Sequence, residues 1–286
     1  MLSLTNSILT SENFCYLDST TFTKIESTDK LFSESLRTES DISTDCNSQS
    51  IKTYENESKL EKLHIDDSTE LSLKDIIKTM SQYQLLQELS LSYSVLSDDL
   101  LTTISCDDRI NLKTIKIEAY PDIKPLPRIS DDTWFTLENR SPNLNLVLTS
   151  YLSDEDDYDI LLTTSMPVTH LFFSGSPSEI TICRIGKNCP RLVELILSSY
   201  NFGTIDQPLI STANGCTKLT SISLGDCELT CSGLIEFVEI CKDRLQLLFI
   251  WETSLVEDTN FDVNEATLRV SSLLGRSWTP ECIPPW

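Results

Sequence analysis

A repeated pattern of apolar residues, L-x-x-L-x-L, occurs eight times in this chain of 286 residues. Successive copies start 26, 26, 31, 25, 24, 27 and 26 residues apart. They begin at Leu60, Leu86, Leu112, Asn143, Val168, Leu192, Leu219 and Leu245, the copy at Asn143 being degenerate. One or two matches would be expected by chance in a leucine-rich chain, whereas a near-constant spacing over eight copies is typical of a repeat protein.

Each copy predicts a short strand followed by a helix. Helical spacing of apolar residues is clear downstream of two copies, at Leu209, Ile210 and Ala213 and at Leu234, Ile235 and Val238. A single strand–helix unit cannot bury its own apolar face, so neighbouring units must stack. We therefore predict an α/β fold, a leucine-rich-repeat solenoid over residues 59–274 with a parallel sheet on its concave face.

The first 58 residues differ from the repeats. They contain 21 Ser or Thr residues and no Pro, and their apolar residues are scattered. Such a segment buries too little apolar surface to offset its ordering entropy. We predict that residues 1–58 are weakly ordered, with a degenerate opening repeat as the alternative.

Ten cysteines raise the question of disulfides or metal. Cys189, Cys216 and Cys241 each stand three or four residues before the Leu that opens a strand, and Cys227 follows a strand directly. These positions suit small buried thiols of a cysteine-containing leucine-rich repeat. No C-x₂-C pair occurs and the chain has only two histidines, so we expect no metal and no cofactor.

The sequence offers no catalytic motif. It lacks a G-x-S-x-G elbow, a Gly-rich phosphate loop and an H-E-x-x-H pair, which indicates a protein that is not an enzyme. A net charge of −22 disfavours nucleic acid and anionic membranes as partners, and no apolar run is long enough to span a membrane. The acidic segment 154–159 lacks the glycine and terminal Glu of a calcium loop. We expect it to be a solvated loop, one that could still meet a basic patch on a partner.

Strand positions 3, 5 and 7 of each repeat predict the recognition surface. They are polar in the early repeats and become apolar later in the chain. An apolar, aromatic strip of this kind is typical of a partner-binding site. The alternatives are that the chain's own C-terminus covers the strip and that the histidine is incidental. The candidate contact residues are His170, Phe172, Ile196, Leu247, Phe249 and Trp251.

The C-terminal segment, residues 275–286, gives a second candidate contact. It contains Trp278 and ends in Ile283, Pro284, Pro285 and Trp286. Prolines reduce the entropy lost when a segment binds, so a terminal Trp on such a stem suits insertion into a pocket. Packing of this segment against the last repeat is the alternative.

Over residues 60–286 the sequence resembles the F-box/leucine-rich-repeat proteins that recruit cryptochromes for ubiquitination in the circadian clock. The most specific similarities are the Cys-Pro-Arg-Leu-Val-Glu-Leu block and the tail that ends in Trp. The resemblance is carried by residues 86–89, 96–101, 189–195, 224–228, 236–238 and 274–286.

The resemblance implies a substrate receptor of an SCF-type ubiquitin ligase, acting in nucleus and cytoplasm. It implies that the concave face binds a cryptochrome-like protein and that Trp286 enters its flavin pocket on the stem formed by Pro284 and Pro285. Residues 1–58 lack the Leu-Pro pattern of an F-box, so a Skp-type adaptor and cullin are expected only if an F-box is supplied. The alternative is an F-box-less scaffold or decoy that binds partners without recruiting a ligase.

Overall fold

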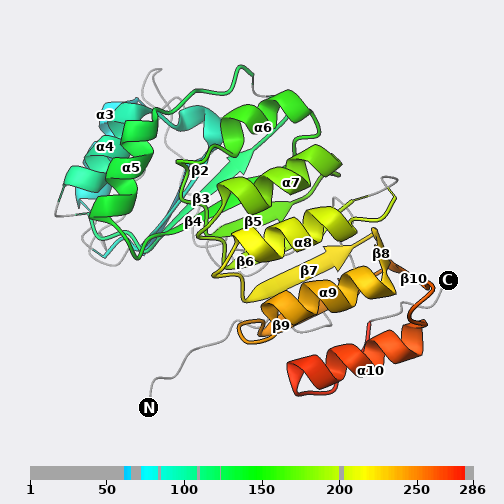
Figure 1. Ribbon diagram of the computed structural model, residues 1–286. Helices are drawn as coiled ribbons and strands as arrows, with labels where there is room; N and C mark the ends of the chain where they lie inside the picture. The colour runs from blue at the N-terminus through cyan, green and yellow to red at the C-terminus, as the bar shows by residue number, and fades with distance from the viewer. Residues whose placement is uncertain are drawn as a thin grey trace, which may run out of the picture. The chain divides into compact units, whose positions relative to one another are not determined.

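Short runs of alternating residues form one eight-stranded sheet in the computed structural model, which describes residues 61–65, 72–82, 85–107, 110–122, 124–199 and 203–280 (Figure 1). All described residues belong to the unit Tyr54–Trp286. Neighbouring strands are parallel and follow one another in chain order. The strands of this sheet are β1 (Lys62–Ile65), β2 (Glu88–Ser92), β3 (Thr114–Ala119), β4 (Asn145–Ser150), β5 (His170–Phe173), β6 (Glu194–Ser198), β7 (Ser221–Gly225) and β9 (Leu247–Trp251).

The helices cover one face of this sheet and stack in chain order, as Figure 1 shows. Their starts are defined by the sequence: the hydroxyls of Ser97, Ser130, Ser178 and Thr230 each accept a hydrogen bond from the backbone N–H three residues on. The helices are α3 (Leu73–Gln82), α4 (Asp98–Cys106), α5 (Asp131–Arg140), α6 (Glu155–Leu161), α7 (Glu179–Asn188), α8 (Asp206–Gly215), α9 (Cys231–Cys241) and α10 (Val263–Leu274). A 3₁₀ turn, Tyr93–Val95, and a two-stranded sheet of β8 (Glu228–Thr230) and β10 (Ser254–Val256) complete the fold.

The core lies between the sheet and the helices, and the predicted leucine-rich-repeat solenoid is confirmed. Because side chains alternate along a strand, template positions 4 and 6 turn towards the helices. Leu89, Leu91, Leu195 and Leu197 show this burial, with at most 1% of each exposed. Within the described residues, no helix combines the length and the hydropathy that crossing a membrane requires.

The cysteines of the repeats are buried thiols, as their spacing predicts. Cys189, Cys216, Cys227 and Cys241 are free and at most 3% exposed. Burial raises the pKa of the Cys216 thiol to about 12. In the described part of the chain, no three or more His, Cys, Asp and Glu side chains are grouped so as to hold a metal ion.

The strand registry changes at β4. Leu146 pairs with Ile115 of β3, but it is Leu148 that pairs with Leu171 of β5. The repeat template would place Leu146 opposite both Ile115 and Leu171. From β5 onwards the strands are therefore displaced by two residues relative to β4 and the strands before it. Because side chains alternate with a period of two, this displacement leaves every core residue on the core face.

The acidic segment 154–159 is not the solvated loop expected from the sequence, because Glu155–Leu161 is a helix. Tyr158 and Leu161 are completely buried, and three acidic residues in the first turn favour the helix through its dipole. The carboxylates are also paired: Lys124 Nζ lies 2.7 Å from Asp154 and 2.9 Å from Asp157. The segment is therefore a structural part of the solenoid.

Two glycines allow α7 and α8 to approach closely. A Cβ atom on Gly215 would lie 1.6 Å from the carbonyl oxygen of Gly186, and one on Gly186 would lie 2.4 Å from that of Ser211. Any side chain at either position would overlap backbone of the neighbouring helix. The spacing of these two repeats therefore depends on glycine.

Candidate protein-binding surface

The side chains that face away from the helices form rows across the sheet. The registry fixes the members of each row, since paired residues of neighbouring strands lie side by side. The first row is Ser90, Lys116, Val147, His170, Glu194, Ser221 and Leu247, and the second is Ser92, Glu118, Thr149, Phe172, Ile196, Ser223 and Phe249. The rows are polar over β2 and β3, whereas half of their members from β4 onwards are apolar.

We call the apolar members of these rows the apolar strip: Val147, Phe172, Ile196, Leu247 and Phe249. Leu247 is 46% exposed, and Phe172, Ile196 and Phe249 are half-buried. Four of these five residues are candidate contacts predicted from the sequence, and the structure brings them onto one face. The exposed Leu247 and the half-buried Phe249 lie at one end of the strip, and the half-buried Phe172 and Ile196 lie on β5 and β6. Such side chains are chemically suited to an apolar surface of another protein.

Trp251 shares the face of the apolar strip but contributes little exposed surface. Its indole lies over Gly225, where a Cβ atom would come within 2.1 Å of the ring atoms Cε2 and Cζ2. The ring also stacks on Phe249, with centroids 5.7 Å apart. Only 4% of Trp251 is exposed, so its contribution is to support Phe249 from the side.

His170 lies in the first row with a defined hydrogen-bonding arrangement. The Thr169 hydroxyl donates to the Leu146 carbonyl oxygen at 3.0 Å and lies 2.9 Å from His170 Nδ1. The tautomer of the imidazole decides which of the two groups donates in the hydrogen bond between the Thr169 hydroxyl and Nδ1. Burial lowers the pKa of His170, and the Glu194 charge opposes this shift. The imidazole therefore offers a polar group that favours the neutral form beside the apolar strip.

The polar end of the surface is internally paired. Glu88 lies between two lysines, 3.6 Å from Lys62 Nζ and 2.7 Å from Lys116 Nζ.

At the other end of β3, Tyr120 stacks on Tyr151 with centroids 4.7 Å apart. Sequence reasoning missed this aromatic pair, although each tyrosine occupies the ninth position of its repeat and that coincidence could have revealed it.

Trp278, predicted as a contact residue, is placed in the core. Only 8% of it is exposed, and its indole N–H donates to the Leu248 carbonyl oxygen at 2.9 Å. Its backbone N–H donates to the Ser271 hydroxyl at 2.9 Å, and that hydroxyl donates to the Trp278 carbonyl oxygen at 3.0 Å. The predicted contacts Ile283, Pro284, Pro285 and Trp286 lie outside the described residues.

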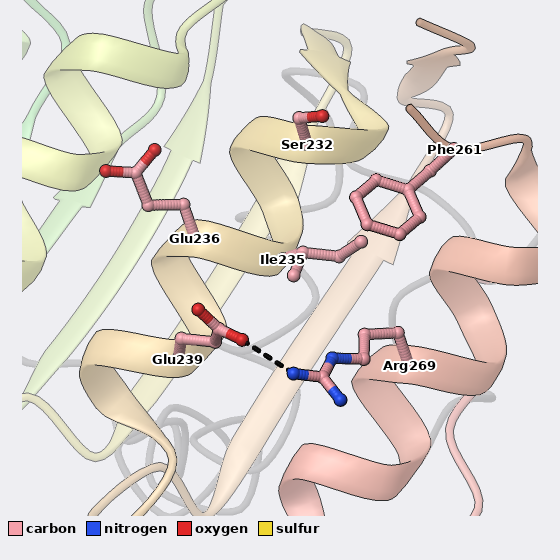
Figure 2. Close-up of a pocket in the computed structure, with 6 residues that line it drawn as sticks. All are labelled: Ser232, Ile235, Glu236, Glu239, Phe261 and Arg269. Atoms are coloured by element: carbon pink, nitrogen blue, oxygen red, sulfur yellow. Dashed lines mark hydrogen bonds and ion pairs between the residues drawn. The ribbon is translucent and has the colours of Figure 1, made fainter. Parts of the chain in front are cut away.

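A groove of 650 Å³ lies on the opposite side of the molecule, between α9 and α10 (Figure 2). Ile235 and Phe261 face each other across it, and the ion pair of Glu239 with Arg269, 2.9 Å long, spans it. Both members of the pair are about half exposed, at 45% and 51%, so the bridge is weak. Ser232 and Glu236 complete the lining of the groove.

No family model matches the chain. It is similar to F-box/LRR-repeat protein 21 of Mus musculus, Bos taurus and Ovis aries, with 34% identity over 249 residues in each case. The match covers 86% of this chain and 57% of each relative, so the chain spans just over half the length of these proteins. Among solved structures, a chain of the Rad7 and Elc1 complex of yeast aligns over 77% of this chain and 62% of its own length, with 17% identity and a TM-score of 0.39.

Proposed function

Because this chain is a relative of the mammalian F-box/LRR-repeat protein 21, we propose that it is the substrate-recognition subunit of an SCF-type ubiquitin ligase. The observation that carries the proposal is the apolar strip on the helix-free face of a solenoid related to such proteins. A subunit of this kind makes and breaks no bonds itself. It raises the effective concentration of its target at the ligase, which prepares the target for proteasomal degradation.

The proposed target is a cryptochrome-like protein, as the sequence resemblance implies. The apolar strip forms the cradle, with His170 offering a hydrogen-bonding group at its edge. Ile283, Pro284, Pro285 and Trp286 form the inserted segment, with Trp286 in the flavin pocket of the target. We place this activity in the nucleus and cytoplasm, which imaging of the tagged chain would test.

The apolar strip is tested by substitution at its centre. Ile196→Asp puts a charge among half-buried apolar side chains without touching the core face of β6. It should weaken binding to cryptochrome at least ten-fold, because an unpaired charge would be buried at the interface. The matched control is Leu268→Asp on α10, where the side chain is 72% exposed on the helix side. Equal binding by wild type and Ile196→Asp would remove the strip from the proposal.

The inserted segment is tested by competition. Free flavin should displace the wild-type chain from cryptochrome, since both would occupy one pocket. Free flavin should no longer displace a chain that ends at Pro280. This chain should still bind cryptochrome with the part of the affinity that the strip supplies. Unaltered flavin competition in the shortened chain would argue against a role for Trp286.

Ligase recruitment is tested separately from target binding. The proposal predicts that the chain is found with a Skp-type adaptor and cullin when an F-box is supplied in the same polypeptide. A chain that captures cryptochrome but no adaptor in a pull-down would instead be a scaffold or decoy. The two measurements together distinguish a receptor from a competitor for the same target.

A further inference from the structure

Two tyrosine rings stack at the polar end of the helix-free face. Tyr120 follows β3 and Tyr151 follows β4, their ring planes are 10° apart, and both side chains are half-buried. The Tyr151 N–H donates to the Ala119 carbonyl oxygen at 2.9 Å, so the ladder between the two strands continues up to the pair. The sheet backbone therefore places the two rings side by side.

The carboxylate of Glu118 lies beside this pair. Tyr120 comes two residues after Glu118, so both side chains face away from the helices. The Tyr120 hydroxyl donates a hydrogen bond to Glu118 Oε2. Burial and, after it, this hydrogen bond raise the pKa of the Tyr120 hydroxyl, which therefore stays protonated at neutral pH. The carboxylate is thus held at the edge of the stacked rings.

No cation of the described residues lies within ion-pairing distance of Glu118. The lysine of the same strand, Lys116, pairs with Glu88 at 2.7 Å, and Lys124 pairs with Asp154 at 2.7 Å. A hydroxyl donor stabilises a carboxylate without neutralising it. A negative charge therefore remains at this point of the surface.

The outer face of the Tyr151 ring borders a small side chain. The ring centroids are 4.7 Å apart, close to the spacing of ~4.8 Å between strands, so the rings stack in the direction that crosses the sheet. The Tyr151 face turned away from Tyr120 therefore looks towards β5. There the Ser174 N–H donates to the Ser150 carbonyl oxygen at 2.9 Å, which places the exposed Ser174 beside Tyr151. A planar group can reach this ring face.

These features suit the guanidinium of an arginine. It is planar and cationic, it stacks on tyrosine rings, and it donates hydrogen bonds to carboxylates. Along the second row, Glu118 pairs with Thr149, which pairs with Phe172 of the apolar strip. Two strand spacings, about 10 Å, therefore separate Glu118 from the strip.

We propose that Glu118, Tyr120 and Tyr151 form a binding site for an arginine side chain of the partner protein. The inference rests on the proposed function for the identity of that partner. The guanidinium stacks on Tyr151 and donates to Glu118, while an apolar side chain of the partner contacts Phe172. The site selects a partner that presents a positive charge about 10 Å from an apolar group.

The first test requires no partner. The full chain with carbon-13-labelled tyrosine is titrated with N-acetyl-arginine amide, and separately with N-acetyl-citrulline amide, which has nearly the same shape without the charge. The ring signals of Tyr120 and Tyr151, assigned by replacing each with Phe, should shift with the arginine compound only. Glu118→Gln should reduce the shift about three-fold, whereas Glu236→Gln, exposed on α9, should not. Equal shifts with both compounds, or none with arginine, would overturn the proposal.

The second test measures binding to cryptochrome. Glu118→Gln and Tyr151→Leu should each weaken binding about five-fold, since one removes the charge and the other the ring face. Tyr151→Phe keeps that face and should bind nearly as well as the wild type. The loss in Glu118→Gln should shrink as ionic strength rises from about 0.1 M to about 1 M, because salt screens the charge. Glu236→Gln is again the matched control.

The two tests separate the inference from the proposed function. If the wild-type chain does not bind cryptochrome, the proposed target is wrong, and the titration alone decides whether the site takes an arginine. If cryptochrome binds Glu118→Gln as tightly as Glu236→Gln, the target stands and the arginine site falls. Thermal unfolding identifies any variant that no longer folds, and the comparison of Tyr151→Leu with Tyr151→Phe then replaces Glu118→Gln.

Discussion

Trp251 can lie flat against the sheet because its neighbour in β7, Gly225, has no side chain. The indole occupies the space that a Cβ atom would take and stacks on Phe249. The orientation of a candidate contact residue is therefore determined by a glycine 26 positions earlier in the chain. Periodicity identified Trp251 as a residue of the helix-free face, but it could not show that the ring is almost completely covered.

Gly225→Ala should displace the Trp251 ring and destabilise the fold by about 1–3 kcal/mol, the usual cost of overpacking. Urea unfolding followed by tryptophan fluorescence measures the change. Combining Gly225→Ala with Trp251→Ala should cost less than the sum of the single changes, because the clash no longer exists. Additive losses would mean that the two residues do not compete for the same space.

Glu252, the residue after Trp251, adopts a left-handed backbone conformation with φ of +47°, as does Asp226 at +52°. Burial and, after it, the charge of Asp226 raise the pKa of the Glu252 carboxyl above 4.5. Since the folded state binds this proton more tightly than the unfolded state, the group stabilises the fold at acid pH. That contribution is lost as pH rises through the raised pKa.

Glu252→Gln should therefore gain stability relative to the wild type as pH rises from below 4.5 to neutral. The amide keeps the shape of the side chain and the backbone conformation while removing the charge. Thermal unfolding across this pH range gives the comparison, and Glu228→Gln on β8 serves as the matched carboxyl-to-amide control. A difference between wild type and Glu252→Gln that is flat with pH would contradict the expected linkage.

At the scale of whole elements, the contact of α7 with α8 provides a test of opposing effects. Alanine normally stabilises a helix relative to glycine by about 1 kcal/mol. At Gly215 the added Cβ would lie 1.6 Å from the carbonyl oxygen of Gly186, so the two helices would have to separate. The free-energy cost of separating the two helices should exceed the gain in helix propensity.

Gly215→Ala should lower the free energy of unfolding by about 1–3 kcal/mol despite the gain in helix propensity. Chemical denaturation measures this value. Asn214→Ala, at an exposed position one residue earlier on the same helix, should show only the small propensity effect. A Gly215→Ala variant as stable as Asn214→Ala would mean that the helices can move apart at little cost.

The elements that the sequence predicts well are those governed by periodicity. The strands, the buried cysteines and helices α8 to α10 follow from the spacing of apolar residues. The acidic segment 154–159 was wrongly predicted as a loop because its charges dominate the local sequence. Tyr158 and Leu161 supply the buried face of α6, and Lys124 and Arg184, distant in sequence, supply the cations that pair with it.

The sequence likewise predicts part of the candidate surface and misses part of it. Its position on the helix-free face follows from strand alternation, and so does the identity of the apolar strip. The burial of Trp278 could not be inferred, because it depends on a turn in which Ser271 and Leu248 come together from distant parts of the chain. Tertiary hydrogen bonds of this kind leave no periodic signal.

For the whole molecule, charge repulsion opposes the stacking of repeats. The net charge is −22, and this excess of acid remains after every lysine and arginine is counted, including those that pair with Glu88 and Glu155. Salt shortens the range of this repulsion, from about 30 Å at 0.01 M to about 8 Å at 0.15 M ionic strength. Added salt therefore weakens the long-range repulsion between like charges more than it weakens the attraction within ion pairs at contact distance.

The midpoint of thermal unfolding should therefore rise as sodium chloride is added between these two concentrations. Differential scanning calorimetry at constant pH measures it. A midpoint that falls with added salt would mean that the ion pairs contribute more to stability than the repulsion removes. Adding sucrose instead of salt controls for effects of the solute that do not involve charge.

The two-residue displacement at β4 has a consequence for any ligand of the helix-free face. A solenoid with uniform registry has translational symmetry, so a ligand could shift by one repeat and meet the same arrangement of rows. The displacement, about 6.6 Å along the strand direction, breaks that symmetry once among the described strands, between β4 and β5. A bound protein that spans this break therefore fits the surface in one register only, and the backbone rather than any one side chain sets that register.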